Sequence, residues 1–339
     1  MTSTGSHRIG TADASFVFEQ ANDDHSLLQA ALRQGMAFPY ECSSGGCGSC
    51  RFKPVEGAFE VLWEEAPGLS RRDRRKGLQL ACQTRATSDL IIEVSPDEGC
   101  RPLVIPARRR VTLASREEVT HDIVEFRFTA EEAAAFLPGQ YAVLENADGV
   151  RRCYSMSGVP EGGSDWSFQI RRVPGGRFTE WLFGAPMGTE VVLDGPYGMA
   201  HLRPDVDREV LCVAGGSGLS PIVSILRALA GLGGGRRIHF FHGGRTPRDL
   251  FAPALVEELG LGDRLEYVPV VSDPENQLSA DWAGATGFVH EAVATALGER
   301  VREMEVYFAG PPPMAEAMQR MLMVDLGVPF GQIHFDRFF

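Results

Sequence analysis

Four cysteines have a spacing that suits metal ligation. Cys42, Cys47 and Cys50 stand in PYECSSGGCGSC, separated by four and then two residues, and Cys82 follows in LACQT. Plant-type [2Fe-2S] clusters are held by four thiolates with this spacing. Structural zinc sites usually pair their ligands in two short C-x-x-C knuckles, so zinc is the weaker interpretation. The sequence therefore predicts a [2Fe-2S] cluster, with the loop glycines turning backbone N–H groups toward the sulfur atoms.

A second group of chemically useful side chains stands in VRRCYSMSG. We expect Arg152, Tyr154 and Ser155 to share one face of a barrel strand, which would gather a cation, an aromatic ring and a hydroxyl. A flavin dinucleotide uses these groups to clamp its pyrophosphate, to pack its ring and to receive a hydrogen bond at its reactive edge. Ser155 is therefore a candidate catalytic residue. The R-x-Y-S pattern also occurs in ordinary strands, and its position between the cysteine loop and a glycine-rich loop is what favours the flavin.

A possible phosphate site follows in IRRVPGGRFTEWL. Gly175, Gly176 and Thr179 stand just before or at the start of a helical pattern there. Backbone N–H groups at a helix N-terminus bind phosphate readily. We expect these three residues to contact the same flavin dinucleotide.

A glycine-rich loop follows a buried strand in VLCVAGGSGLSPIVSIL. Gly215, Gly216, Ser217 and Gly218 separate that strand from an amphipathic run with Pro221 near its start. A pyrophosphate can approach such glycines closely at the N-terminus of the helix, and a first-turn proline favours that helix. The third glycine of the usual dinucleotide fingerprint is absent, and a plain strand-to-helix turn is the alternative. We expect these four residues to bind a nicotinamide dinucleotide.

Two more segments, HGGRTPRD and AGPPPM, each follow an apolar strand. Ligands of parallel sheets bind outside the carboxyl ends of the strands, so Gly310 and Pro311 are expected beside the nicotinamide. Arg245 and Arg248 could meet a ribose 2′-phosphate, and no acidic residue of HGGRTPRD stands alone to bind a 2′-hydroxyl. The sequence leaves NADH and NADPH both open.

The composition is that of an ordinary globular protein. The 339 residues are 44% hydrophobic and 23% charged, with a net charge of -12. No apolar stretch approaches the roughly eighteen residues of a membrane span, and the start lacks a secretory signal, so a cytoplasmic protein without membrane partners is expected. The negative charge argues against nucleic acid. One basic run, RRDRRK at residues 71–76, suits either a solvated loop or a docking patch for an acidic partner.

Hydrophobic periodicity divides the chain into three domains. Residues 1–100 open with short strands and a helix capped by Asn22 or Asp23. Residues 101–204 show short alternating strands, which indicate a small antiparallel barrel. In residues 205–339 apolar strands alternate with helical patterns, which predicts a parallel α/β sheet. The whole is an α+β multidomain chain.

The cysteine motif, R-x-Y-S, GGSGLSP, GPPPM and the ending IHFDRFF occur in this order. Together they resemble the reductase components of bacterial aromatic-ring oxygenases, including those of carbazole-type dioxygenases and toluene-type monooxygenases. The resemblance covers nearly the whole chain. It implies a β-grasp-like ferredoxin domain, a β-barrel FAD domain and a parallel Rossmann-like NAD domain. It also implies FAD rather than FMN, because the cluster domain comes first, and NADH as the preferred donor.

The resemblance also implies roles for single residues. It assigns FAD or nicotinamide contacts to Arg152, Tyr154, Ser155, Gly176, Thr179, Gly216, Gly218 and Pro313. Many similar proteins have a cysteine where this chain has Ala309, which puts a thiol role in doubt but not hydride transfer. In similar reductases an acidic residue two positions before an aromatic closes the flavin site, as Asp336 and Phe338 would. Phe338 is therefore the expected catalytic lid over FAD, with Phe339 beside it, and packing of a last strand into the sheet is the alternative.

The expected activity is of the ferredoxin–NAD+ reductase type. A hydride passes from NADH to FAD, and single electrons then pass through the [2Fe-2S] cluster to a ferredoxin or an oxygenase. A Rieske dioxygenase is slightly favoured as the partner over a diiron monooxygenase. The alternatives are a redox-sensing binding protein with the same cofactors and a stand-alone reductase of another redox chain.

Overall fold

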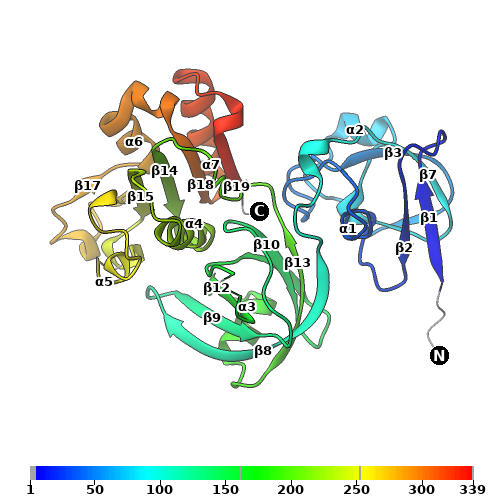
Figure 1. Cartoon of the computed structure of the whole chain (residues 1–339), viewed down its shortest axis with the longest axis horizontal. Coiled ribbons are helices and arrows are strands. Elements are labelled where there is room, and N and C mark those ends of the chain that lie inside the picture. The colour runs from blue at the N-terminus through cyan, green and yellow to red at the C-terminus, as the bar shows by residue number, and fades with distance from the viewer. Residues whose placement is uncertain (1–4, 161, 252, 338–339) are drawn as a thin grey trace. The chain divides into compact units, whose positions relative to one another are not determined.

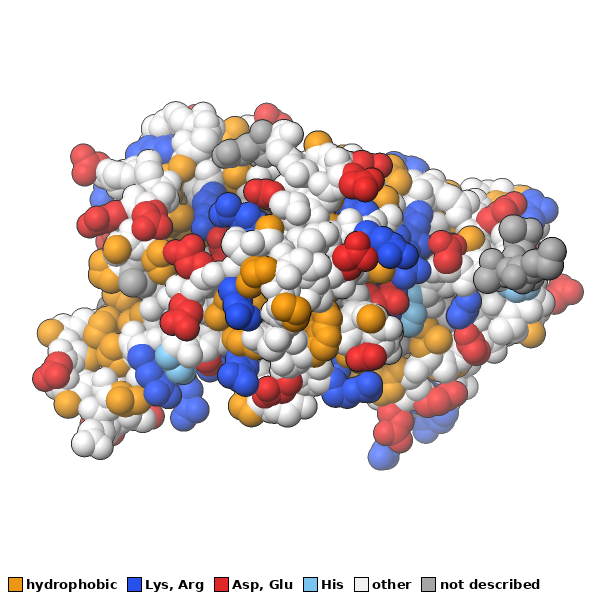
Figure 2. All heavy atoms as spheres, turned by 90° about the horizontal axis from the view of Figure 1, so that it is seen from below, with side chains coloured by type: hydrophobic (Ala, Val, Ile, Leu, Met, Phe, Trp, Pro, Cys, Tyr) orange, Lys and Arg blue, Asp and Glu red, His pale blue; other side chains and the backbone are white. Residues whose placement is uncertain are grey.

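The computed structural model describes residues 5–160, 162–251 and 253–337. The chain forms two compact units, which are considered separately (Figure 1). The first comprises the residues up to Ala107 together with the short segment Gly195–Gly198, and the second comprises the barrel and the α/β domain. Among the described helices, none combines the length and the hydropathy required to cross a bilayer. On the face drawn in Figure 2, acidic and basic side chains are interspersed.

The first unit is built on a mixed sheet with the strand order β2-β1-β7-β3-β5. β1 pairs antiparallel with β2 and parallel with β7, and a small hairpin of β4 and β6 stands apart. The strands are β1 (Ser6–Gly10), β2 (Val17–Ala21), β3 (Arg51–Glu56), β4 (Phe59–Val61), β5 (Gln79–Leu80), β6 (Thr84–Ala86) and β7 (Leu90–Glu93). The helices are α1 (Leu27–Arg33) and α2 (Arg71–Arg75). The expected β-grasp-like architecture is confirmed.

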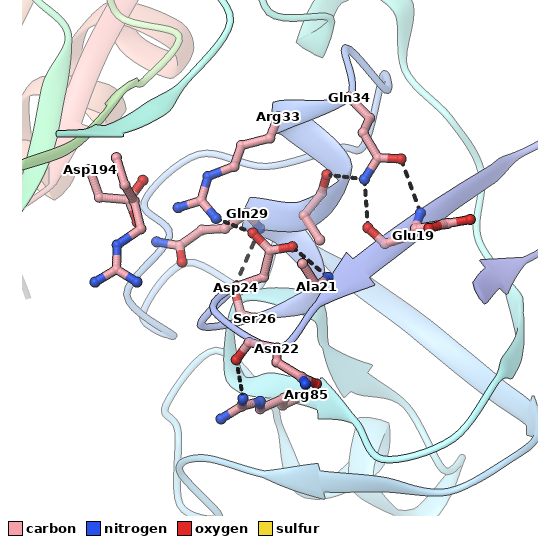
Figure 3. Close-up of polar contacts among 12 residues, drawn as sticks. Glu19, Ala21, Asn22, Asp24, Ser26, Gln29, Arg33, Gln34, Arg85 and Asp194 are labelled. Carbon is pink, nitrogen blue, oxygen red and sulfur yellow. Dashed lines mark hydrogen bonds and ion pairs between the residues drawn. The ribbon is translucent and has the colours of Figure 1, made fainter. Parts of the chain in front are cut away.

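The cap predicted for α1 is wrong. Ser26 caps the helix, because its side chain accepts a hydrogen bond from the backbone N–H of Gln29. The carboxylate of Asp24 instead accepts the N–H of Ala21 and pairs with Arg33 at the end of the helix (Figure 3). Burial raises the pKa of Asp24 despite that ion pair. The turn before α1 thus uses its own polar groups, and the helix begins later than the pattern indicated.

The second unit begins with an antiparallel sheet of the order β11-β10-β13-β8-β9-β12. A bridge between Met156, just after β11, and Phe168 of β12 joins the two edges and closes the barrel. Buried aromatic residues, among them Phe126 and Trp166, fill it. The elements are β8 (Ala107–Glu118), β9 (Ile123–Thr129), β10 (Tyr141–Glu145), β11 (Arg151–Ser155), β12 (Asp165–Arg171), α3 (Arg177–Gly184) and β13 (Glu190–Tyr197).

The remainder is a parallel sheet of the order β17-β16-β15-β14-β18-β19. Side chains of β14 alternate between two cores, since Cys212 lies in the core with α4 and Val213 in the core with α6 and α7. Helices therefore cover both faces, as predicted for a Rossmann-like domain. The strands are β14 (Val210–Gly215), β15 (Ile238–Gly244), β16 (Leu265–Val271), β17 (Ala285–Thr286), β18 (Glu305–Gly310) and β19 (Ile333–Arg337). The helices are α4 (Leu219–Gly231), α5 (Pro253–Glu257), α6 (Val289–Leu297) and α7 (Pro312–Arg320).

Candidate functional site

The four predicted cluster ligands lie together as two close pairs. The Sγ atoms of Cys50 and Cys82 are 3.4 Å apart. A hydrogen bond from Cys47 lowers the pKa of Cys42 to about 5. The pKa of Cys82 is raised first by Cys50 and by burial, and further by Cys42 and Cys47, so all four thiols interact. Two pairs of thiols this close fit a cluster of two irons with four cysteine ligands.

The backbone of the loop points N–H groups at two of these sulfur atoms. The N–H groups of Ser44 and Cys47 donate to Cys42 Sγ at 3.5 and 3.3 Å, and that of Ser49 donates to Cys47 Sγ at 3.4 Å. Such donors stabilise thiolates and tune the potential of the metal that they hold. The loop therefore provides ligands and their hydrogen bonds in one short segment.

Two loop glycines are required by the backbone. Gly45 and Gly48 have positive φ angles of +88° and +79°. A Cβ at Gly48 would lie 2.4 Å from the carbonyl oxygen of Gly68, and Gly68 N–H donates to Gly45 C=O at 2.8 Å. Gly68 thus buttresses the cluster loop. The sequence analysis missed it, because this contact joins residues that no motif links.

The R-x-Y-S residues lie on β11 with different exposures. Arg152 is exposed and makes no ion pair with a described residue, which leaves its guanidinium available for a phosphate. The preceding residue, Arg151, instead forms an ion pair with Glu145. Tyr154 is half-buried with its ring 5.5 Å from that of Phe178, and burial raises its pKa.

The expectation that Ser155 shares the face of Arg152 and Tyr154 is wrong. Side chains alternate along a strand, so Ser155 points to the side opposite its neighbour Tyr154. Ser155 is only 5% exposed, and its Oγ atom finds no hydrogen-bond partner among the described residues. Buried hydroxyls are nearly always partnered, which makes this one a vacant donor. A flavin edge that accepts a hydrogen bond fits this donor.

The turn before α3 is closed by Thr179. Its hydroxyl accepts from the N–H of Val173 at 3.3 Å and lies 3.2 Å from the carbonyl oxygens of Val173 and Gly176. Gly175 has a φ of +73°, and a Cβ at Gly176 would lie 2.6 Å from Thr179 Oγ1. The three predicted residues therefore form one tight turn at the N-terminus of α3. Their contact with FAD stays a prediction.

The glycine-rich loop lies at the carboxyl ends of three neighbouring strands. Gly215 at the end of β14 pairs with Gly243 of β15, and Ala214 pairs with Ala309 of β18. A Cβ at Gly218 would lie 1.9 Å from the carbonyl oxygen of Ala309. Any side chain at this crossing would force the turn or the neighbouring strand to move. Gly216 and Ser217 lie between these two glycines, in the turn before α4.

The other predicted nicotinamide residues come from the same edge of the sheet. Gly310 ends β18, and Pro311 is the N-cap of α7. Arg245 is exposed just beyond the end of β15. The carboxylate of Asp249 accepts the N–H and the hydroxyl of Thr246 at 2.7 and 2.9 Å, so it caps its own turn. The strand ends thus gather the predicted residues along one edge.

A polar row on α4 ties this edge to the barrel. Ser220 donates to the carbonyl of Ser155 at 2.7 Å, and Ser224 donates to that of Gly158 at 2.6 Å. Arg227 donates to the carbonyl of Ser157. The sequence analysis missed this row, although its spacing in LSPIVSILRALAG puts three polar residues on one face of an otherwise apolar helix.

An ion pair extends the row into the barrel. Arg227 contacts both carboxylate oxygens of Glu125 at 3.0 and 3.3 Å, and Ser157 and Gln169 donate to the same group. Burial opposes ionisation of Glu125, but Arg227 and these hydrogen bonds outweigh it and lower the pKa. Ser220 also accepts the N–H of Gln169 at 3.1 Å. The strand of Ser155 and the helix after the glycine loop are therefore held in one hydrogen-bonded arrangement.

The predicted lid lies outside the described residues. β19 ends at Arg337, which pairs with Gly310, and Asp336 is buried opposite Ala309. Phe338 and Phe339 follow that strand and are not among the residues that the structure describes.

Comparisons with known proteins match each part of this arrangement. The 2Fe-2S iron–sulfur cluster binding domain matches residues 11–87, the oxidoreductase FAD-binding domain residues 110–202, and the oxidoreductase NAD-binding domain residues 212–320. The chain is 43% identical to a ferredoxin–NAD(P)+ reductase of Metapseudomonas resinovorans over 320 residues, which cover 93% of this chain and 94% of that protein.

Two further proteins are similar over nearly the whole chain. The electron transfer component of the xylene/toluene monooxygenase of Pseudomonas putida is 36% identical, over 93% of this chain and 89% of that protein. The solved structure of the ferredoxin reductase in carbazole 1,9a-dioxygenase superposes with a TM-score of 0.89 at 37% identity and covers 99% of each chain. With its cluster, FAD and NAD domains in the same order, the chain belongs to the family of iron–sulfur flavoprotein reductases that supply electrons to bacterial oxygenase systems.

Proposed function

We propose that this reductase passes electrons from NADH to the ferredoxin or the oxygenase of an aromatic-ring-hydroxylating system. A Rieske dioxygenase is slightly favoured as the final acceptor, because the relative at 43% identity is a ferredoxin–NAD(P)+ reductase and the similar solved structure serves carbazole 1,9a-dioxygenase. The observation that carries the proposal is the buried hydroxyl of Ser155, which has no hydrogen-bond partner in the described part of the chain and whose own backbone is bonded to the helix that follows the glycine loop.

The chemistry comes from the bound groups: the nicotinamide supplies a hydride, FAD takes up two electrons and gives them up singly, and the cluster carries one at a time. The protein orients these groups. Arg152 is placed to bind the pyrophosphate of FAD with a guanidinium that no described carboxylate occupies. The hydroxyl of Ser155 donates a hydrogen bond at the reactive edge of the ring, and Gly216 and Gly218 let the nicotinamide dinucleotide approach the backbone.

Several finer assignments belong to this proposal. Domain boundaries at residues 1–100, 101–204 and 205–339 are supported by the family matches that fall within them. NADH is proposed over NADPH, although exposed Arg245 keeps a cation near the end of β15. The proposal also includes a cytoplasmic location and a lid over the flavin formed by Phe338 and Phe339.

Replacing one cluster ligand tests the order of electron transfer. Cys82→Ser should abolish reduction of a one-electron protein acceptor such as cytochrome c, while NADH oxidation by ferricyanide largely survives, because ferricyanide can take electrons at the flavin. Cys100→Ser, at a cysteine outside the cluster motif whose Sγ already has the carbonyl oxygen of Tyr40 as an acceptor at 3.9 Å, is the control and should retain both activities. Loss of both activities in Cys82→Ser, with FAD still bound, would contradict the proposed order. Slow NADH oxidation with every acceptor in the unchanged protein would favour a sensor instead.

A further inference from the structure

Helix α2 carries an unusual concentration of unpaired positive charge. Arg71, Arg72, Arg75 and Lys76 are exposed, and none of them forms an ion pair with a described residue. The acidic residue within the run, Asp73, is already occupied, because it accepts hydrogen bonds from Ser70 and lies 3.4 Å from Arg51. In a chain with a net charge of -12, these four cations within six residues form a local concentration of positive charge. Fixed, unneutralised charge of this kind attracts a partner of opposite sign.

The helix is hydrogen-bonded to a segment that lies against the cluster loop. Ser70 and Asp73 form a capping box at its start. Arg74 turns back and donates to the carbonyls of Glu64 and Ala66, the latter at 2.9 Å. Ala66 in turn lies against Gly45 of the cluster loop, since a Cβ at Gly45 would be 3.3 Å from its side chain. The cations of α2 are thus held at a fixed position relative to the cluster ligands.

An exposed aromatic side chain lies at the same place. Trp63 is 45% exposed, and its ring is 3.2 Å from a Cβ built at Gly45, between the cluster ligands Cys42 and Cys47. Leu62 beside it is 36% exposed. Large exposed aromatic side chains are the commonest anchors of protein interfaces. Trp63 therefore offers such a side chain beside the loop that carries three of the cluster ligands.

Acidic side chains also lie near Trp63 and offset part of the positive charge of α2. Glu64 and Glu65 follow Trp63 and are exposed. The cations of the 71–76 run nevertheless outnumber these two carboxylates and Asp73. Positive charge therefore dominates on the α2 side of Trp63.

We propose that Trp63 together with Arg71, Arg72, Arg75 and Lys76, here called the α2–Trp63 surface, docks an acidic one-electron acceptor protein. The cations steer the acceptor, and the tryptophan fixes it in apolar contact over the cluster loop. An acidic acceptor is the occupant because the surface is cationic while the rest of the chain, which is negative, would repel it elsewhere. The inference rests on the proposed function and specifies the chemistry of the partner.

The test uses two small haem proteins of opposite charge as acceptors, acidic cytochrome b5 and basic cytochrome c, with the holoprotein reduced by NADH. The double variant Arg71→Glu and Arg75→Glu should reduce cytochrome b5 about tenfold more slowly at low salt, and its rate should lose most of its salt dependence. Its rate with cytochrome c should not fall. Trp63→Ala should slow cytochrome b5 reduction while leaving the salt dependence as it was.

A matched control carries the same change of charge elsewhere. Arg127→Glu with Arg320→Glu alters two exposed arginines on the second unit and should leave cytochrome b5 reduction within about twofold of the unchanged protein. Cluster absorbance and ferricyanide reduction report that each variant is intact. An unchanged rate and salt slope in the α2 variant, or an equal loss in the control, would overturn the inference. If the unchanged protein reduces ferricyanide but neither cytochrome, the proposed function fails as well.

Discussion

Gly218 offers a quantitative test of how the glycine loop positions the nicotinamide. Its φ is -63°, so alanine would suffer no backbone strain there. The obstacle is the backbone at Ala309 and Gly310, whose nearest atom, the carbonyl oxygen of Ala309, would lie 1.9 Å from the new Cβ, about 1 Å closer than Cβ atoms are found to approach. That oxygen belongs to a buried strand, so the turn between β14 and α4 must move by roughly 1 Å. Overpacking of this kind costs about 1–3 kcal/mol in unfolding free energy.

The same displacement should be costly for hydride transfer. A shift of about 1 Å in a reacting group can reduce a rate roughly 100-fold, so we expect Gly218→Ala to lower kcat/KM for NADH with ferricyanide by about that factor. FAD content and cluster absorbance should be retained, because the residues expected to hold FAD and the cluster lie in other segments of the chain.

Gly231→Ala is the matched control for Gly218→Ala. Gly231 is the last residue of α4, and a Cβ there meets nothing within 4 Å. This variant should keep its activity, and alanine in a helix should stabilise it by up to about 1 kcal/mol. Stopped-flow reduction of the flavin by NADH and urea unfolding measure the two effects. If Gly218→Ala reduced its flavin at the unchanged rate, the loop would not set the hydride geometry.

Two further predictions concern buried polar groups. Ser155→Ala should slow flavin reduction by about 10- to 100-fold and shift the flavin absorbance. It should also raise the unfolding free energy of the FAD-free protein by about 1 kcal/mol, because it removes a buried hydroxyl that has no partner among the described residues. A fall in that unfolding free energy would refute the claim that this hydroxyl lacks a partner. Burial lowers the pKa of His242 from 6.5 to about 4. Its neutral form therefore contributes stability that is complete above pH 6.5 and is lost as the pH falls toward 4, at about 1.4 kcal/mol of unfolding free energy per pH unit. His242→Asn should flatten the decline of urea midpoints between pH 6.5 and 5 by about half. The other half remains because burial and Arg203 likewise lower the pKa of His201 to about 4. An unaltered slope would count against this assignment.

The fold was predictable where a pattern is local and repeated. The strand Val210–Ala214 was expected from a continuous apolar run, and β14 occupies Val210–Gly215 because both of its faces are buried. The start of α1 was missed for the opposite reason. Several residues before that helix can act as caps, and the hydrogen bond from Gln29 N–H to the side chain of Ser26 shows which of them does so. Sequence periodicity carries no information about that choice.

The residues of the candidate site were likewise predictable where the pattern is local and were missed where it is not. The cysteine spacing encodes the cluster because three ligands lie on one loop, whose own N–H groups bond the sulfur atoms. Gly68 carries no such signal, since it is required only by the close approach of Gly45 and Gly48 from another part of the chain. Ser155 was singled out from its motif, but its orientation on β11 follows from the alternation of the strand. Residues whose role depends on a distant contact are therefore the ones that sequence reasoning misses.

The hydrogen bonds of helix α4 join the FAD domain to the NAD domain, and hydride transfer needs this polar contact. Its first residues follow the glycine loop, and two residues after Gly218 the side chain of Ser220 donates to the backbone carbonyl of Ser155. An apolar contact is non-directional and would allow the two surfaces to slide, whereas a hydrogen bond fixes distance and direction. Hydride transfer requires reacting atoms within about 3–3.5 Å, a tolerance that sliding surfaces would exceed. Ser224 and Arg227 repeat the attachment farther along the helix, so the glycine loop and the flavin strand keep one relative position while each binds its own cofactor.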